Sequence, residues 1–209
     1  MTWPVAALSP VATDRTGSAA VEFALVAPVL CLMLVGGLDL AHQAYLRAVV
    51  QGSLDDASRR ATVQNPGFTA SGSTAEARVQ ATIARQLRAI APRATITVTQ
   101  SNFYHFTGIG NPEKLMTDTG HDGQFDAGEG DCWEDLNRNG EYDANAGRSG
   151  VGGANDAVFY KVRVTMPRLF PVSAMLGQSR TLVIQAQTAV RNQPYADQQV
   201  PPVLCGNAT

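Results

Sequence analysis

The chain has 209 residues, of which 44% are hydrophobic and 16% charged, and its formal net charge is −2. This balance excludes the general basic footprint of a nucleic-acid-binding protein, so we expect no nucleic acid among the partners. About 170 residues follow an N-terminal apolar segment, which is enough for one domain with a hydrophobic core.

The first predicted elements are a leader and a membrane-spanning helix. Residues 1–17 contain Pro4, Pro10 and Gly17, which argue against a helix there. Residues 18–40 follow, and their central part, 23–38, carries no charge. At about 1.5 Å per residue, this segment gives roughly 35 Å of helix, enough to cross a bilayer. Glu22 at its edge is costly in lipid and therefore indicates a function.

The helical pattern continues beyond the predicted span. Apolar residues recur mostly every three or four positions through residues 41–63, while Asp55, Asp56, Arg59 and Arg60 lie off that face. We therefore predict one continuous helix from about Ser18 to about Val63, which Asn65-Pro66-Gly67 ends. Pro28 is tolerated in a membrane helix.

The remainder, 64–209, is predicted to be one α+β domain. Residues 75–91 form an amphipathic helix, and residues 93–100, 157–166 and 180–191 form strands because they alternate or are β-branched. Residues 107–156, which include a long acidic loop at 113–150, and the proline-containing tail are expected to be irregular. The predicted fold is a long helix, a second helix and a three- to four-stranded antiparallel sheet.

The N-terminal motif resembles the processing site of prepilin-like proteins. Gly17 is followed by four small or apolar residues and then by Glu22 and Phe23. Together with Pro28 and the polar exit after Gly36-Gly37, residues 15–63 resemble the TadE-like family of tight-adherence (Flp-type IVb) pilus assembly proteins. Residues 152–172 and 188–194 are also similar to the periplasmic part of that family.

The resemblance implies a pilin-like minor pseudopilin that a prepilin peptidase cleaves between Gly17 and Ser18. Glu22 would then neutralise the new Ser18 amine of a neighbouring subunit. The implied location is the bacterial inner membrane, with one span and a periplasmic C-terminal domain, or the pilus itself. The implied partners are other pseudopilins or the major pilin, through the N-terminal helix, and the inner-membrane pilus machinery.

Charge alone does not fix the orientation of the span. On the leader side, Arg15 stands beside Asp14, whereas Arg47, Arg59 and Arg60 follow the predicted membrane span. The positive-inside rule therefore does not favour a cytoplasmic leader, and the expected orientation comes from the family resemblance.

Residues 113–143 hold 10 of the 18 acidic residues and contain two patterns that resemble EF-hand calcium loops. Oxygen ligands are expected at positions 1, 3, 5, 9 and 12, with glycine at position 6. The first loop offers Asp118, Asp122, Asp126 and Glu129, but has Gly120 at position 3. The second offers Asp135, Asn137, Asn139 and Asp143, but has Ala146 at position 12. We expect modest Ca²⁺ affinity; the alternative is a solvated stretch of Asx turns.

Cys132 and Cys205 are the two cysteines of the polar part, and export would favour a disulfide between them. The alternative is two reduced, unrelated thiols. The histidines are scattered, and no catalytic motif is present in the sequence, so no enzyme is expected. The alternative to a pseudopilin is an anchored or secreted calcium-binding domain unrelated to pili, cut near residues 43–45 or not at all.

Overall fold

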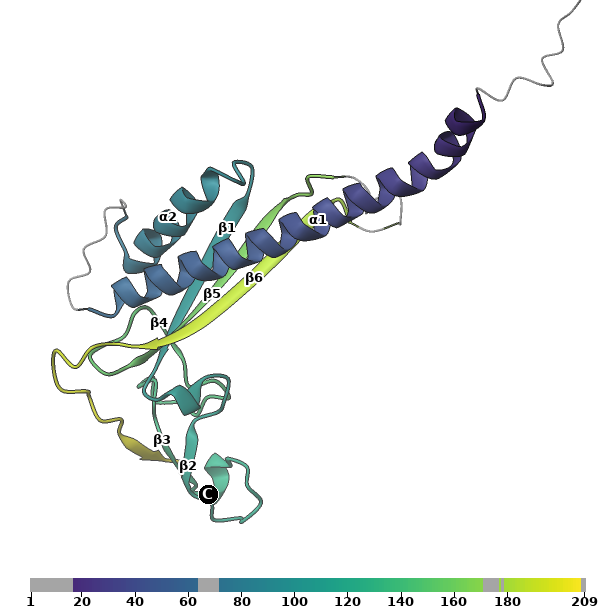
Figure 1. Cartoon of the computed structure of the whole chain (residues 1–209). Helices are drawn as coiled ribbons and strands as arrows, with labels where there is room; N and C mark the ends of the chain where they lie inside the picture. The colour runs from purple at the N-terminus through teal and green to yellow at the C-terminus, as the bar shows by residue number, and fades with distance from the viewer. Residues whose placement is uncertain (1–16, 64–71, 171–176, 178, 208–209) are drawn as a thin grey trace, which may run out of the picture. The chain divides into compact units, whose positions relative to one another are not determined.

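The computed structural model describes residues 17–63, 72–170, 177 and 179–207 (Figure 1). The predicted leader up to residue 16 and the predicted stop at 65–67 lie outside these residues. The main elements are α1 (Ser18–Ala61), α2 (Ala75–Arg88), β1 (Thr95–Phe103), β5 (Ala157–Pro167) and β6 (Thr181–Arg191). Shorter ones are η2 (Phe106–Gly108), β2 (Lys114–Thr117), η3 (Ala127–Glu129), β3 (Cys132–Glu134), β4 (Arg148–Ser149) and β7 (Val203–Cys205). The predicted α+β class is confirmed.

Contacts divide the chain into two units. The first combines Met1–Gln43 with Arg168–Arg180, and the second combines Ala44–Pro167 with Thr181–Thr209. Helix α1 therefore supplies its N-terminal part to the first unit and its C-terminal part to the second. Each unit is described by itself below.

In the first unit, α1 is apolar all round. Its most apolar 18-residue window has a mean hydropathy of 2.3, and no residue of that window is buried. Within the described chain, α1 alone is long and apolar enough to cross a membrane. The helix starts at Ser18, as predicted, and includes Pro28. None of the described residues of the unit covers this apolar surface, and its length suggests membrane anchoring.

In the second unit, α1 becomes amphipathic. Its buried face repeats at three- and four-residue intervals, through Leu46, Val50, Leu54, Ala57 and Ala61. That spacing places the residues on one stripe of the helix. The helix ends at Ala61, two residues before the predicted end.

Helix α2 has clear start and stop signals. The Thr74 side chain accepts a hydrogen bond from the Ala77 N–H at 3.2 Å, which caps the first turn. Val79, Ile83 and Leu87 are completely buried and share one face. The helix ends at Arg88, earlier than the predicted residue 91, and Pro92 follows shortly after.

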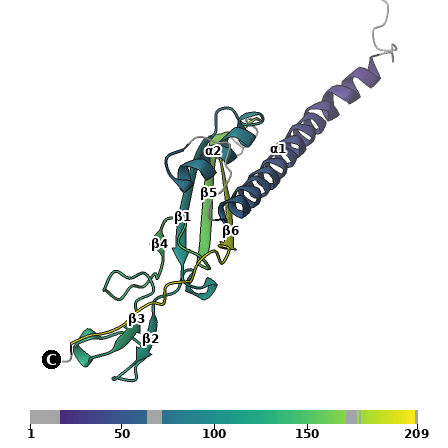
Figure 2. The ribbon, with the colours of Figure 1, turned by 90° about the vertical axis from the view of Figure 1, so that its left-hand side faces the viewer.

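The main sheet is antiparallel, with the strand order β4-β1-β5-β6. Val98 of β1 faces Val162 of β5, which in turn faces Ala186 of β6. The three long strands run side by side in Figure 2. Residues with alternating burial along β5 put one face of the sheet into the core. Strand β1 continues to Phe103, three residues beyond its predicted end.

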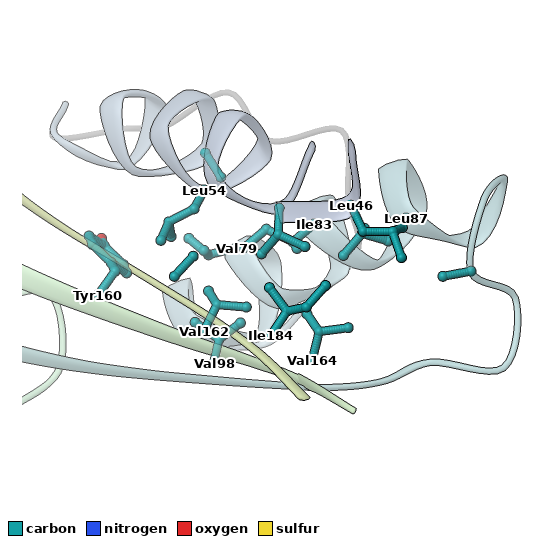
Figure 3. Packing of buried hydrophobic residues seen from close by; sticks show 14 of the residues in the cluster. Leu46, Leu54, Val79, Ile83, Leu87, Val98, Tyr160, Val162, Val164 and Ile184 are labelled. Atoms are coloured by element: carbon teal, nitrogen blue, oxygen red, sulfur yellow. The ribbon is translucent and has the colours of Figure 1, made fainter. Parts of the chain in front are cut away.

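The core lies between this face and the two helices. Leu46 and Leu54 of α1, Ile83 of α2 and Val162 and Ile184 of the sheet belong to one buried cluster (Figure 3). Burying a leucine or isoleucine side chain contributes about 1.5–3 kcal/mol relative to leaving it in water. Hydrophobic contact therefore holds the C-terminal part of α1 and α2 on the sheet.

A second, three-stranded antiparallel sheet has the order β2-β3-β7. The expectation of one irregular acidic loop is wrong at β2, β3 and β4, and the expectation of an irregular tail is wrong at β7. These strands have two to four residues each, and they pair with strands from other parts of the sequence. Such pairings leave no alternating pattern long enough to detect.

Candidate functional site

The predicted processing site lies at the beginning of α1. The Gly17 carbonyl accepts the Val21 N–H at 3.2 Å, which is the first bond of the helix. Ser18, Glu22 and Phe23 are exposed, and the Ser18 hydroxyl lies 3.4 Å from Glu22 Oε1. The residues of the motif therefore occupy the first turn and a half of an exposed helix end.

Gly17 has no conformational or packing reason to be a glycine in the described structure. A Cβ added to it would meet nothing within 4 Å among the described residues, and its φ is not in the left-handed region. The folded chain would accept a larger residue here. A requirement for glycine would therefore come from an external agent that reads the backbone at this position.

Cys132 and Cys205 are joined by a disulfide with an S–S distance of 2.04 Å. They face each other across β3 and β7, and 73 residues separate them in the sequence. The bond therefore fastens the strand after the first acidic loop to the C-terminal strand. Cys31 in the apolar part of α1 is free and exposed.

The first acidic loop is organised by its own aspartates. Each accepts a backbone N–H of the loop at 2.7–2.8 Å: Asp118 from Gly123, Asp122 from Gln124, and Asp126 from Gly128. Gly123, at position 6, has a φ of +77°, which allows the sharp turn. The bonds of Asp122 and Asp126, each to the residue two positions on, are the Asx turns of the alternative interpretation, whereas the bond of Asp118 spans five residues.

Negative charge is nevertheless concentrated in this loop. Desolvation, followed by the charges of Asp126, Asp131, Asp122 and Asp118, raises the pKa of the Glu129 carboxyl. A Cβ on Gly120 would overlap the Glu129 carboxylate, so the residue at position 12 occupies the space that a ligand at position 3 would need. Asp118 Oδ1 is buried and has no hydrogen-bond partner. Without a cation, this buried oxygen has no partner that replaces its lost hydrogen bonds to water.

The second acidic loop contains the same kind of turn. Asp135 accepts the N–H groups of Asn139 and Gly140 at 3.1 and 2.9 Å, and Gly140 has a φ of +84°. The amide groups of Asn137 and Asn139 both donate to the Asp143 carboxylate. Asn137 and Asn139 are therefore brought together at Asp143, whereas Asp135 binds backbone N–H groups of the same loop.

Two buried acidic residues support the loops from outside the predicted ligand sets. Glu113 accepts the N–H of Asn137 at 3.2 Å and that of Asp143 at 3.1 Å. Burial raises the pKa of its carboxyl, against the lowering effect of these bonds. Asp131 accepts N–H groups of Thr119 and Asp126 at 2.8 Å each, and these bonds lower the pKa of its carboxyl.

The sequence analysis did not distinguish Glu113 and Asp131 from the other acidic residues. Their role depends on burial, at 1% and 0% exposure, and burial here comes from strand pairing that the sequence does not reveal. Both act on backbone N–H groups and so stabilise loop conformation. A buried carboxylate that binds backbone N–H groups can be recognised only once the fold is known.

An aromatic cluster lies beside the two loops. Phe125 stacks on Tyr142 with ring centroids 4.4 Å apart, and packs edge-on against Trp133 at 4.9 Å. Tyr142 and Trp133 are 6.4 Å apart. Each loop therefore contributes a ring to a small apolar centre on the second sheet.

In the described residues, no three His, Cys, Asp or Glu side chains converge in a way that could hold a metal ion. Asparagine and backbone oxygens, which calcium also uses, lie outside that criterion. The predicted calcium ligands are thus grouped loop by loop. Most of their carboxylates accept backbone N–H groups, whereas that of Asp143 accepts the side-chain amides of Asn137 and Asn139. The donor chemistry and the uncompensated Asp118 Oδ1 still suit a calcium ion in the first loop.

Comparison with known proteins identifies the N-terminal segment. Residues 17–59 match a family model described as TadE-like protein. The match begins at the predicted processing glycine and ends two residues before the end of α1, so the family resemblance is confirmed for this segment. Residues 152–172 and 188–194 lie outside it. No curated protein and no solved structure matches the chain.

Proposed function

We propose that this protein is a minor pseudopilin that takes part in the assembly of a tight-adherence pilus. The TadE-like segment carries the proposal, because it contains both the processing motif and the exposed apolar part of α1. In this proposal α1 crosses the bacterial inner membrane once, and the α+β domain lies in the periplasm. The protein has a structural role and catalyses no reaction.

The proposed maturation step is hydrolysis of the Gly17–Ser18 peptide bond by a prepilin peptidase. The bond lies at an exposed helix end, where the chain itself does not require a glycine. Cleavage would create a Ser18 amine one helical turn from Glu22, whose carboxylate already lies near the Ser18 hydroxyl. In a helix bundle, Glu22 would pair with the amine of a neighbouring pseudopilin or of the major pilin.

The N-terminal sequence of the protein from native membranes tests this proposal. We expect it to begin at Ser18. Gly17→Leu would block cleavage, visible as a slower-migrating precursor on a gel, and would abolish pilus formation. Gly52→Leu is the matched control, because Gly52 is also exposed on α1 without close neighbours. Normal cleavage of Gly17→Leu, or a native N-terminus at Met1 or near residue 43, would contradict the assignment.

A calcium ion in the first acidic loop is a second proposal. It is supported by the buried, unpartnered Asp118 Oδ1 in a loop whose acidic side chains have no nearby cation to balance them in the described structure. Calcium would supply the missing positive charge, with Asp118, Asp122, Asp126 and Glu129 as the residues that would hold it. The second loop would bind more weakly, since Asn137 and Asn139 are neutral ligands.

Terbium luminescence can test the ion, because Trp133 packs beside Phe125 of the loop and can sensitise bound Tb³⁺. We expect Tb³⁺ emission that Ca²⁺ displaces, and faster proteolysis within residues 113–150 after chelation. Asp118→Asn would reduce the emission at least several-fold, whereas Asp197→Asn, an exposed aspartate outside both loops, would not. Equal emission from both variants would refute a site in the first loop.

A further inference from the structure

A cavity lies in the second unit, between the β4 region and the segment that follows β6. Its volume is about 440 Å³, and Asn102, Arg148, Asp156 and Tyr195 are among the residues that line it. Small-molecule sites usually have volumes of about 300–1,000 Å³. The lining includes no residue of the processing motif or of the two acidic loops, so the roles described above leave this cavity unused.

One wall of the cavity, residues 148–153, is fixed from inside by two buried asparagines. Asn102 Nδ2 lies 3.1–3.2 Å from the carbonyl oxygens of the first three residues of this wall. Asn192 Nδ2 donates to two further carbonyls of it, at 2.7 and 2.8 Å. Gly152 has a φ of +65°, and a Cβ there would lie 2.6 Å from Asp156 Oδ2. The wall is therefore preformed, as ligand sites usually are.

The Asn102 side chain has one end without a partner. Because its Nδ2 faces the carbonyls of the wall, its Oδ1 is turned away from them. The residue is 2% exposed, and Oδ1 has no hydrogen-bond partner among the described residues. Buried acceptors are normally hydrogen-bonded. Since Asn102 lines the cavity, an N–H or O–H group of a bound molecule would supply the missing partner.

The charges in the cavity wall balance each other. Arg148 Nη2 lies 3.4 Å from Asp156 Oδ2, and the two side chains are 35% and 6% exposed. Asp197, the other charged residue of the lining, is exposed to water, which screens its charge. An ion would therefore find no buried charge that lacks a counter-ion. A guanidinium has five N–H groups, so Arg148 can still donate to a neutral carbonyl or hydroxyl oxygen.

Tyr195 supplies a partly apolar surface to the same cavity. Its side chain is 40% exposed, so one side of the ring is open to a ligand. A tyrosine ring packs on the C–H face of a flat molecule, and its hydroxyl binds polar groups. The cavity thus combines an acceptor on Asn102, donors on Arg148 and a ring surface, without net charge in its buried wall.

We propose that this cavity binds an N-acetylated amino sugar. The acetamido N–H would donate to Asn102 Oδ1, the acetamido oxygen would accept from Arg148, and the sugar ring would pack against Tyr195. An apolar ligand would leave Asn102 Oδ1 without a partner, and a peptide group alone offers no ring for Tyr195. Bacterial cell-wall glycan consists of such sugars, so the site would suit the periplasmic location, and this choice of source rests on the proposed function.

Isothermal titration calorimetry of the full-length protein tests the site, in lauryldimethylamine oxide micelles because this detergent contains no sugar. The probe is chitotriose, a trimer of N-acetylglucosamine. Cellotriose is the matched control ligand, since it is also neutral and has a hydroxyl in place of each acetamido group. We expect saturable binding of chitotriose and about tenfold weaker binding of cellotriose, which lacks the amide hydrogen bonds.

Tyr195→Ala should weaken chitotriose binding at least about fivefold. Tyr45→Ala is the matched control variant, because Tyr45 is also exposed, at 55%, and does not line the cavity. Equal affinity for the two sugars, unchanged affinity in Tyr195→Ala or no binding of chitotriose would each overturn the proposal. N-acetylalanine methylamide that competes as well as chitotriose would also overturn it, in favour of a peptide ligand.

A second measurement distinguishes the sources of the sugar. Retention of the protein by purified peptidoglycan sacculi would identify the cell wall, whereas chitotriose binding without retention would indicate a soluble oligosaccharide. Failure of sugar binding would leave the pseudopilin assignment untouched, because the N-terminal sequence of the native protein tests that assignment separately.

Discussion

Asp131 shows how one side chain can fix a loop. It is fully buried, and each of its carboxylate oxygens accepts one backbone N–H, from Thr119 and Asp126. Both donors lie within the first acidic loop, seven residues apart, so a single carboxylate ties two parts of the loop together. Aspartates in this region were expected to bind calcium, but the Asp131 carboxylate binds backbone N–H groups instead.

We predict that Asp131→Asn lowers the midpoint of urea denaturation of the loop region, because an amide NH₂ would face one of the two N–H donors. The folded-state pKa of Asp131 is lowered. Its stabilising contribution is therefore complete above the unfolded pKa, about 3.9, and is lost as pH falls through the folded pKa. The difference between wild type and variant should be largest near pH 7 and disappear in acid.

Tryptophan emission from Trp133, with a chelator present to exclude any ion, would follow this unfolding. Asp197→Asn, on an exposed aspartate, serves as the control and should leave the midpoint unchanged. A difference between wild type and Asp131→Asn that grows toward low pH would contradict the assigned role.

At the scale of elements, the sequence was informative wherever a periodic pattern was long. Helix α1, α2 and the strands β1, β5 and β6 all follow predicted segments, because each buries a face through several repeats of its own period. Strands β2, β3, β4 and β7 were missed since a pairing of two to four residues is decided by distant partners. Asp118 and its neighbours were recognised as turn-forming or metal-binding, but sequence could not say which backbone groups they cap.

The disulfide between β3 and β7 has a predictable energetic role. Replacing Cys132 and Cys205 by serine should destabilise the small sheet by about 2–4 kcal/mol, mainly because the unfolded chain gains freedom. Hydrogen exchange should quicken in β2, β3 and β7, while β5 and β6 keep their protection. Cys31→Ser, which removes the unpaired thiol, should leave both sheets unchanged; loss of protection throughout the four-stranded sheet would show that the two sheets unfold together.

At the scale of the molecule, the two parts of α1 suit different surroundings. The N-terminal part of α1 is apolar on all sides, and its C-terminal part presents a single buried stripe. This change of pattern was visible in the sequence, and the predicted boundary near residue 40 lies close to Gln43, where the first unit's share of α1 ends. The pairing of Asp39 with Arg168 was not visible, because 129 residues separate the partners.

The covalent link between β3 and β7 also constrains the order of events during biosynthesis. Strands β5 and β6 lie between the two bonded cysteines in the sequence. The thiol of Cys132 therefore has no native partner until both long strands of the four-stranded sheet have been made. Formation of this disulfide therefore shows that the chain between the two cysteines has already been synthesised. A reduced Cys132 marks a chain that is still incomplete or unfolded.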